Sequence, residues 1–310
     1  MQLNRKMNAG YEEQVDTLSA SCGTPYYERA PCGELGQYVK TFFYAYLPGP
    51  NSGYRNNPPG WFTERIVPFG CIDLVIQSEQ VCMMVDPAAK KEILLPRVFI
   101  TPMTTRHLFV KRNANVEIYG IRLHPWMNKY FTGQTMNRVV NSAAGAGVFF
   151  KKHEEELPGI FSMSPVEACD WLEQLLLSMV CNFRAPDQVL VNAIEFIIGE
   201  KGMFGNMDSL FSRYALTSRR VEQKFNETIG LSPKFYSRLI QFQHSVGLLN
   251  GNRVRSLVEL VYECGYYDQA HFIRAFKEFS GVTPGVFSRE NNPISRLMTD
   301  PGSMAFIINR

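Results

Sequence analysis

Apolar residues in the C-terminal third of the chain follow a pattern that is written twice, between residues 206 and 287. Capping, apolar and turn positions of the first copy recur fifty residues later, and beyond the middle of the unit they recur fifty-one residues later. An offset that changes by one residue at one place predicts two units of the same architecture, differing by one insertion in a turn. The matching pairs are Asn206 and Ser256, Met207 and Leu257, Leu210 and Leu260, Ala215 and Gly265, Val221 and Phe272, Phe225 and Phe276, Glu227 and Glu278, Gly230 and Gly281, Ser232 and Thr283, and Pro233 and Pro284.

The second copy predicts two short helices joined by a tight turn. Ser256 followed by Glu259 has the spacing of a capping box, Gly265 ends that helix, and Asp268 can cap the next one. Each helix has one apolar face, and two such helices are too small for a core of their own, so they must share one with their neighbours. The apolar faces comprise Leu257, Leu260, Val261 and Cys264 in the first helix and Phe272, Ala275, Phe276 and Phe279 in the second.

The first copy repeats this plan, and a longer helix lies between the copies. Asn206 and Thr217 can cap the two helices of the first copy, and Gly230 ends the second of them. Ser232 and Pro233 then open a spacer helix with apolar residues at helical spacing up to residue 249. At 1.5 Å per residue the spacer is roughly 26 Å long, which can hold two helix-turn-helix units over neighbouring turns of one DNA duplex.

The second helix of each copy leaves polar side chains outside its apolar stripe. Arginine can bind guanine edges, glutamine and asparagine can bind adenine, and glutamate can accept from the cytosine amino group. Residues 206–290 carry eleven Lys or Arg and eight Asp or Glu, a net charge of +3, so we expect few phosphate contacts and a need for dimerisation. The outward residues are Ser218, Arg219, Glu222, Gln223 and Asn226 in the first copy and Gln269, Ala270, Ile273, Arg274 and Lys277 in the second.

The run from Gly265 to Pro284, GYYDQAHFIRAFKEFSGVTP, resembles the signature of the AraC/XylS family of transcription regulators. This resemblance implies seven helices, with two helix-turn-helix units joined by a long helix. The sequence departs from the family pattern at Ala215, which replaces the usual turn glycine, and at Glu222, which replaces a neutral or basic reader. Carried over by position, Ser218, Arg219, Glu222 and Gln223 fall on the first recognition helix, and Gln269, Ala270, His271, Ile273 and Arg274 fall on the second.

From residue 26 to 131 the pattern changes to short apolar runs broken by Pro and Gly, which predict strands of a small β-barrel or sandwich. Together with the helical C-terminal part, this gives an α+β chain. The runs from Arg65 to Ile76 and from Tyr119 to Trp126 resemble the cupin-like sensor domain that precedes this DNA-binding unit in some AraC-type regulators. The predicted strands are Phe42–Leu47, Cys71–Gln77, Val81–Val85, Val98–Thr101, His107–Lys111 and Val116–Leu123.

Aromatic residues on these strands are numerous enough to line an apolar pocket, although any small β core contains such residues. An arginine could orient an anionic effector there, and Arg65, Arg106 and Arg122 are the candidates. The pocket we predict comprises Trp61, Arg65, Phe69, Tyr119 and Arg122, with Phe99, Phe109 and Trp126 as further aromatic candidates.

An enzymatic function is the main alternative, either a metal-dependent cupin or a regulator that accepts alkyl groups on a cysteine. A cupin metal site needs clustered ligands, and His107, Glu117 and His124 are the nearby candidates. Such histidines are more often ordinary surface or core residues than metal ligands. Cys71 and Cys82 have no base adjacent in sequence, so buried inert thiols are favoured over nucleophiles. We therefore predict no catalytic residues, no metal and no cofactor. A third alternative is a protein-binding module that uses the same helical faces.

The 310 residues are 45% hydrophobic with a net charge of +3, which is typical of a soluble protein with two domains. No apolar run reaches membrane-spanning length, the N-terminus does not resemble a secretory signal, and seven cysteines without a Cys-x-x-Cys pair indicate a reducing cytoplasm. A helix opening at Ser164 and Pro165 could pack on its own β unit or pair with a second copy. We expect DNA, a small-molecule effector, a second copy and RNA polymerase as partners. The predicted segments are a flexible N-terminus at 1–24, a sensor domain at 25–150, a linker with a dimerisation helix at 151–185, the DNA-binding domain at 186–290 and a tail at 291–310.

Overall fold

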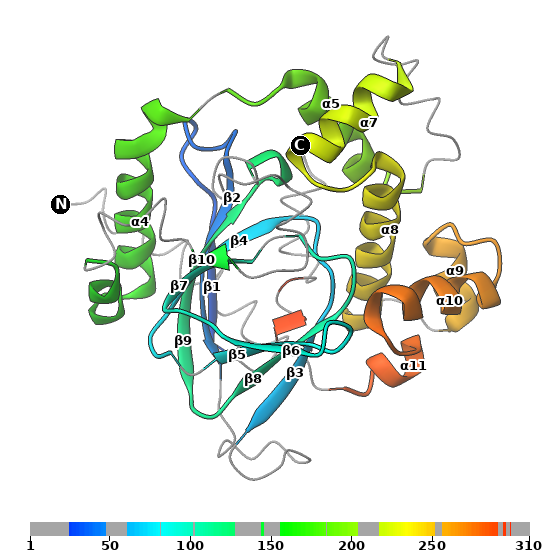
Figure 1. Cartoon of the computed structure of the whole chain (residues 1–310), viewed down its shortest axis with the longest axis horizontal. Helices are drawn as coiled ribbons and strands as arrows, with labels where there is room; N and C mark the ends of the chain where they lie inside the picture. The colour runs from blue at the N-terminus through cyan, green and yellow to red at the C-terminus, as the bar shows by residue number, and fades with distance from the viewer. Residues whose placement is uncertain are drawn as a thin grey trace, which may run out of the picture.

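The computed structural model consists of an antiparallel β unit, in the centre of Figure 1, with a helical unit against one side and a single long helix against the other. The α+β class predicted above is therefore confirmed. The structure describes residues 25–47, 61–80, 82–101, 103–127, 144–145, 156–183, 185–203, 217–251, 256–290, 294–295 and 298.

The β unit is built from two antiparallel sheets. One sheet has the strand order β1-β2-β9-β4-β7-β10, and the other has the order β3-β8-β5-β6. Each of the six strands predicted from the sequence corresponds to an observed one, with each end within three residues of the prediction. β1, β3, β6 and β10 were not predicted, because they lack a clear run or alternation of apolar residues. The strands are β1 Tyr26–Arg29, β2 Val39–Leu47, β3 Phe62–Ile66, β4 Ile72–Gln77, β5 Cys82–Asp86, β6 Lys91–Leu94, β7 Val98–Thr101, β8 Leu108–Arg112, β9 Val116–Leu123 and β10 Ala144–Gly145.

Helix α4 (Pro165–Met179) lies against the β unit of its own chain, on the left in Figure 1. A reciprocal capping box between Ser164 and Glu167 starts it. Its Glu173 accepts hydrogen bonds from the Arg29 guanidinium at 3.0 Å and from the Cys32 backbone N–H at 2.6 Å. Of the two uses expected for this helix, the structure shows packing on the β unit, and pairing with a second copy stays a prediction. The short helices η3 (Leu157–Ser162) and η4 (Val180–Asn182) flank it, and η1 (Pro125–Met127) follows β9.

The helical unit contains the predicted tandem arrangement as far as the structure describes it. Thr217, Ser232, Ser256 and Asp268 each accept a backbone N–H at the start of their helix, which confirms four of the predicted caps. The helix predicted to begin at Asn206, and Ala215 in the turn after it, lie outside the described residues. No helix in the described part of the chain is both long and apolar enough to cross a membrane. The helices are α5 Gln188–Gly199, α7 Ser218–Thr228, α8 Pro233–Asn250, α9 Leu257–Glu263, α10 Gln269–Ser280 and α11 Pro284–Phe287.

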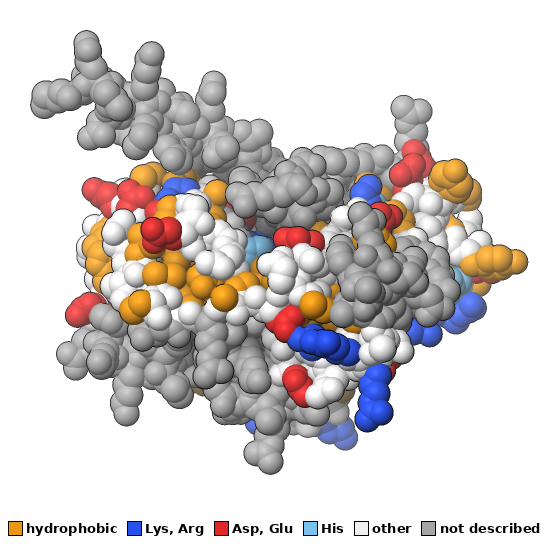
Figure 2. Space-filling view, turned by 90° about the horizontal axis from the view of Figure 1, so that it is seen from above, with side chains coloured by type: hydrophobic (Ala, Val, Ile, Leu, Met, Phe, Trp, Pro, Cys, Tyr) orange, Lys and Arg blue, Asp and Glu red, His pale blue; other side chains and the backbone are white. Residues whose placement is uncertain are grey.

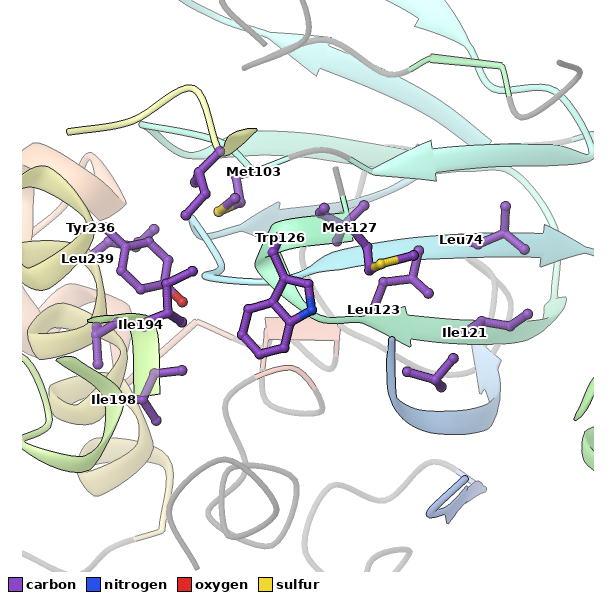
Figure 3. Close-up of a cluster of buried hydrophobic side chains, with 14 of the residues drawn as sticks. Leu74, Met103, Ile121, Leu123, Trp126, Met127, Ile194, Ile198, Tyr236 and Leu239 are labelled. Atoms are coloured by element: carbon purple, nitrogen blue, oxygen red, sulfur yellow. The ribbon is translucent and has the colours of Figure 1, made fainter. Parts of the chain in front are cut away.

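One continuous apolar core joins the two units. In Figure 3, Trp126 lies between β-unit side chains such as Leu123 and helical side chains such as Ile194 and Ile198. The hydroxyl of Tyr236 on α8 donates to the backbone oxygen of Gly70 at 3.1 Å. A Cβ atom at Gly70 would lie only 2.8 Å from Ile240 Cδ1. Close packing of this kind transmits displacements, so the helical unit cannot move relative to the β unit without repacking this core.

Candidate functional site

Helix α7 exposes the polar face that the sequence predicts. Val221 and Phe225 are buried beneath it, and Gly230 ends it with φ of +83°. Lys224 on α7 forms an ion pair with Asp187, which itself caps α5. This ion pair therefore joins α7 to the start of α5. The five residues predicted to read DNA from this helix are all exposed, namely Ser218, Arg219, Glu222, Gln223 and Asn226.

Helix α10 repeats this arrangement in the second copy. Its predicted apolar stripe is fully inside, and Gly281 ends the helix with φ of +78°. Ile273 is half-buried and packs against the core, so its outer edge alone is available to a partner. The other five residues predicted to read DNA are exposed, namely Gln269, Ala270, His271, Arg274 and Lys277. Figure 2 shows that most of the visible Lys and Arg side chains lie over the helical side of the molecule.

The C-terminal end of α10 is bound to the β unit by hydrogen bonds. The backbone N–H of His107 donates to the Phe279 carbonyl at 2.9 Å. Arg65 donates to the Ser280 carbonyl at 2.9 Å and forms a bidentate pair with Glu290, at 2.9 and 3.1 Å. A Cβ atom at Gly281 would lie 2.2 Å from the His107 ring. Docking therefore uses the C-terminal end of α10. Of the exposed residues predicted to read DNA, all but Lys277 lie in the earlier turns of the helix.

A partly enclosed cavity of about 140 Å³ lies inside the β unit. Its wall is almost entirely apolar and comes from both sheets. Ile294 and Met298, from the predicted C-terminal tail, also line it, which the sequence did not indicate. The lining residues are Tyr26, Phe43, Ala45, Leu47, Ile66, Val67, Phe69, Cys71, Asp73, Val75, Gln77, Cys82, Met84, Leu95, Phe99, Thr101, Thr104, Leu108, Val110, Ile118, Arg122, Ile294 and Met298.

An ion pair between Arg122 and Asp73 supplies the charged groups of this wall. Two hydrogen bonds, at 3.0 and 3.2 Å, join the guanidinium to the carboxylate. The guanidinium carbon also lies 4.5 Å from the centre of the Phe69 ring and 5.3 Å from that of Phe43. Glu28 is buried nearby, and burial raises the pKa of its carboxyl group against the opposing effect of Arg122. Arg122 is thus held by a carboxylate and two aromatic rings.

Two of the five residues predicted to form the effector pocket line this cavity. Phe69 and Arg122 line the cavity, whereas Trp61, Arg65 and Tyr119 do not. Alternation along the strands explains why Arg65 and Tyr119 do not line the cavity, because neighbouring residues point to opposite faces of a sheet. On β9, Ile118 and Arg122 face the cavity while Tyr119 packs against Tyr44 and Phe161 on the other face. On β3, Ile66 faces the cavity and Arg65 the helical unit. Trp61 lies half-buried just before β3.

The candidates for enzymatic chemistry lie apart. Among the described residues, no three His, Cys, Asp or Glu side chains come together as a metal-ligand set. His124 stacks on Trp126, with ring centroids 4.3 Å apart, and its Nε2 lies 3.0 Å from the Gly36 carbonyl oxygen. Cys71 and Cys82 line the cavity, and burial raises the pKa of the Cys82 thiol to about 11. A thiol with such a pKa is protonated at neutral pH and is a poor nucleophile.

Comparisons with known proteins match each unit separately. Residues 210–290 match a family described as a helix-turn-helix domain, and residues 27–144 match a domain of unknown function, DUF6597. The HTH-type transcriptional regulator MtrA of Neisseria gonorrhoeae is 26% identical over 104 residues, which are 34% of this chain and 34% of that protein. The chain therefore spans about a third of the length of this curated relative.

Solved structures resemble the chain at low sequence identity. ToxT from Vibrio cholerae is 11% identical, with a TM-score of 0.45 over 74% of this chain and 97% of ToxT. Wild-type ToxT bound to an unsaturated fatty acid is 12% identical, with a TM-score of 0.45 over 76% of this chain and 97% of that one. A probable AraC family regulator from Rhodopseudomonas palustris is 19% identical, with a TM-score of 0.31 over 34% of this chain and all of that one.

Proposed function

We propose that this chain, which carries an AraC-type helix-turn-helix domain at residues 210–290, is a sequence-specific DNA-binding transcription regulator. The observation that carries the proposal is the state of the two recognition helices. Both are capped, both bury their apolar stripe, and both leave hydrogen-bonding side chains exposed. Two helices that served packing alone would not need matching polar faces.

Helix α8 separates the two recognition helices and fixes their spacing. Its 18 residues give a rod roughly 27 Å long at 1.5 Å per residue. Successive major-groove faces of B-DNA lie roughly 34 Å apart, and the widths of the flanking helices supply the difference. We therefore place α7 and α10 in neighbouring major grooves on one side of a duplex.

The decisive experiment recovers the genomic fragments that the purified full-length chain binds, and then measures affinity for the recovered site and for random DNA. Affinity should fall steeply as salt rises, because phosphate contacts release counterions. Arg274→Ala should weaken binding to the recovered site by about 1–3 kcal/mol if Arg274 reads a base. An equal loss on random DNA would assign Arg274 to a phosphate. Arg97→Ala, an exposed change in the β unit, serves as the control. Duplex binding that is independent of salt would contradict the proposal and favour a protein-binding module.

The cavity of the β unit is the proposed effector site. It is concave and apolar with a few polar groups, which is the usual make-up of a small-molecule site. No catalytic role is assigned to its lining, and the raised pKa of Cys82 argues against the alkyl-acceptor alternative.

Adjacent residues on β3 give a physical route from this cavity to α10. Ile294 lines the cavity and donates its backbone N–H to the carboxylate of Glu64. Ser295, fully buried, donates to the Arg65 carbonyl at 2.6 Å, and Arg65 holds Ser280 and Glu290 as described above. We propose that an effector touching Ile294 shifts this segment and thereby the docking of the second helix-turn-helix unit. A homodimer and a contact with RNA polymerase remain predictions.

A further inference from the structure

Each of the three arginines that could have oriented an anionic effector is already bound to a carboxylate. Arg65 pairs with Glu290 at 2.9 Å, Arg106 with Asp86 at 2.6 Å, and Arg122 with Asp73 at 3.0 Å. Only the last of these pairs lines the cavity. A carboxylate ligand would lose its hydration on entering, and among the described lining residues it would meet no cation that lacks a counterion. The charges of the cavity therefore disfavour an anion.

A polar group of the wall instead favours a neutral hydrogen-bond donor. Gln77 is 1% exposed and lines the cavity, and its Nε2 donates to the Leu95 and Pro96 carbonyls at 3.0 and 2.7 Å. These two bonds fix the orientation of the amide, which leaves Oε1 as an acceptor with no partner among the described residues. A buried acceptor without a partner is costly, and a ligand that donates to it would remove that cost.

The size of the cavity limits the ligand further. An engineered apolar cavity of roughly 150 Å³ in another protein stays dry and binds benzene. The cavity described here has about 140 Å³ and a similarly apolar wall. One aromatic ring with a short substituent therefore matches the space.

Taken together, the geometry points to a small, uncharged, mostly apolar ligand that carries one hydrogen-bond donor, with Gln77 as its acceptor. This inference rests on the proposed function, since it names the chemical class of the effector.

Three probes of similar size separate the possible chemistries, namely benzyl alcohol, toluene and benzoate. Each is titrated into the full-length chain, and the melting temperature and the heat of binding are recorded. Benzyl alcohol should raise the melting temperature in a saturable way, because a ligand that binds only the folded state stabilises it. Toluene should bind several-fold to about tenfold more weakly, which corresponds to one net hydrogen bond. Benzoate should produce no shift.

Variants test the location of the site. Gln77→Leu should abolish the preference for benzyl alcohol over toluene. Ala45→Leu should prevent the binding of both probes, because the larger side chain fills the cavity. Ala45→Val is a milder change that should weaken the binding of both probes. Asp73→Asn leaves Arg122 without its carboxylate and should admit benzoate. Tyr119→Phe is the control, because Tyr119 packs on the opposite face of β9 and does not line the cavity.

Binding of benzoate to the unaltered chain as tight as that of benzyl alcohol would overturn the inference, and so would the absence of binding by all three probes. Neither result would affect the proposed function, which is measured separately as DNA binding without a probe. If the unaltered chain showed no site-specific DNA binding, the proposed function itself would be contradicted.

Discussion

The two recognition helices have the same local design but different surroundings. Each begins at a side-chain cap and ends at a glycine with positive φ, Gly230 after α7 and Gly281 after α10. Helix α7 packs on α5 and α8, and its ion pair, Lys224 with Asp187, stays within the helical unit. Helix α10 additionally contacts the β unit through His107.

This difference suggests a division of labour between the two copies. Both expose residues that we predict to read DNA, but hydrogen bonds from the β unit hold the end of α10, through the Phe279 and Ser280 carbonyls. A change in the cavity can therefore alter α10 directly, whereas it can reach α7 only through α8 and the shared core. We therefore predict that the first unit is the constant contact with DNA and that the second unit is the regulated one.

Alanine at the two helix-ending glycines should give the largest difference between the copies. Gly230→Ala should reduce the free energy of unfolding by about 1–2 kcal/mol, the cost of a left-handed conformation for a residue with a Cβ. Gly281→Ala should cost about 2–5 kcal/mol, since its Cβ must also displace the His107 ring from the interface between the units. Urea unfolding of the full-length variants measures both. Equal losses would show that α10 does not depend on its contact with the β unit.

Removing one carboxylate that pairs beside each recognition helix tests whether regulation reaches the second copy alone. Glu290→Gln weakens the partly exposed pair with Arg65 and should cost about 1 kcal/mol of stability. It should also at least halve the change in DNA affinity that benzyl alcohol causes. The matched change for the first copy is Asp187→Asn at the N-cap of α5, which weakens the ion pair with Lys224 of α7 and keeps a residue that can cap α5. Asp187→Asn should leave the benzyl alcohol effect unchanged. A similar loss in both variants would refute the division of labour.

Local sequence signals predicted the helical unit well, because its features act over a few residues. Caps such as Ser232 and Asp268 act within one turn, and the stripe around Phe276 follows helical spacing, so short-range chemistry determines both. The same holds for the longer strands. At the end of α5, in contrast, Gly199 is still helical and the left-handed turn is made by Lys201 and Gly202, so a glycine alone does not locate the end of a helix.

The effector cavity could not be predicted in this way, since it depends on which strands pair and which face is inside. Arg65 and Tyr119 have side chains suited to a pocket, but at their positions in β3 and β9 these side chains point away from the cavity. Asp73 and Gln77 were not identified because nothing local indicates that they approach Arg122 and the Leu95 carbonyl. Ile294 is separated from β3 by some 230 residues and contacts it only in the folded chain.

The pH dependence of the α10 contact should give the smallest effect. Burial lowers the pKa of His107 from its ordinary value of 6.5, and Arg65 and Arg106 add to this, against Glu290 and Asp86. The folded chain therefore holds His107 neutral at pH values where the unfolded chain takes up a proton. The contribution of His107 to the free energy of unfolding is at its most favourable above pH 6.5. It is lost progressively as the pH falls from 6.5 to the lowered pKa. His107→Gln should accordingly make the free energy of unfolding less dependent on pH below 6.5, as measured by urea unfolding at several pH values. Equal pH slopes in the variant and the unaltered chain would show that His107 is not held neutral at this interface.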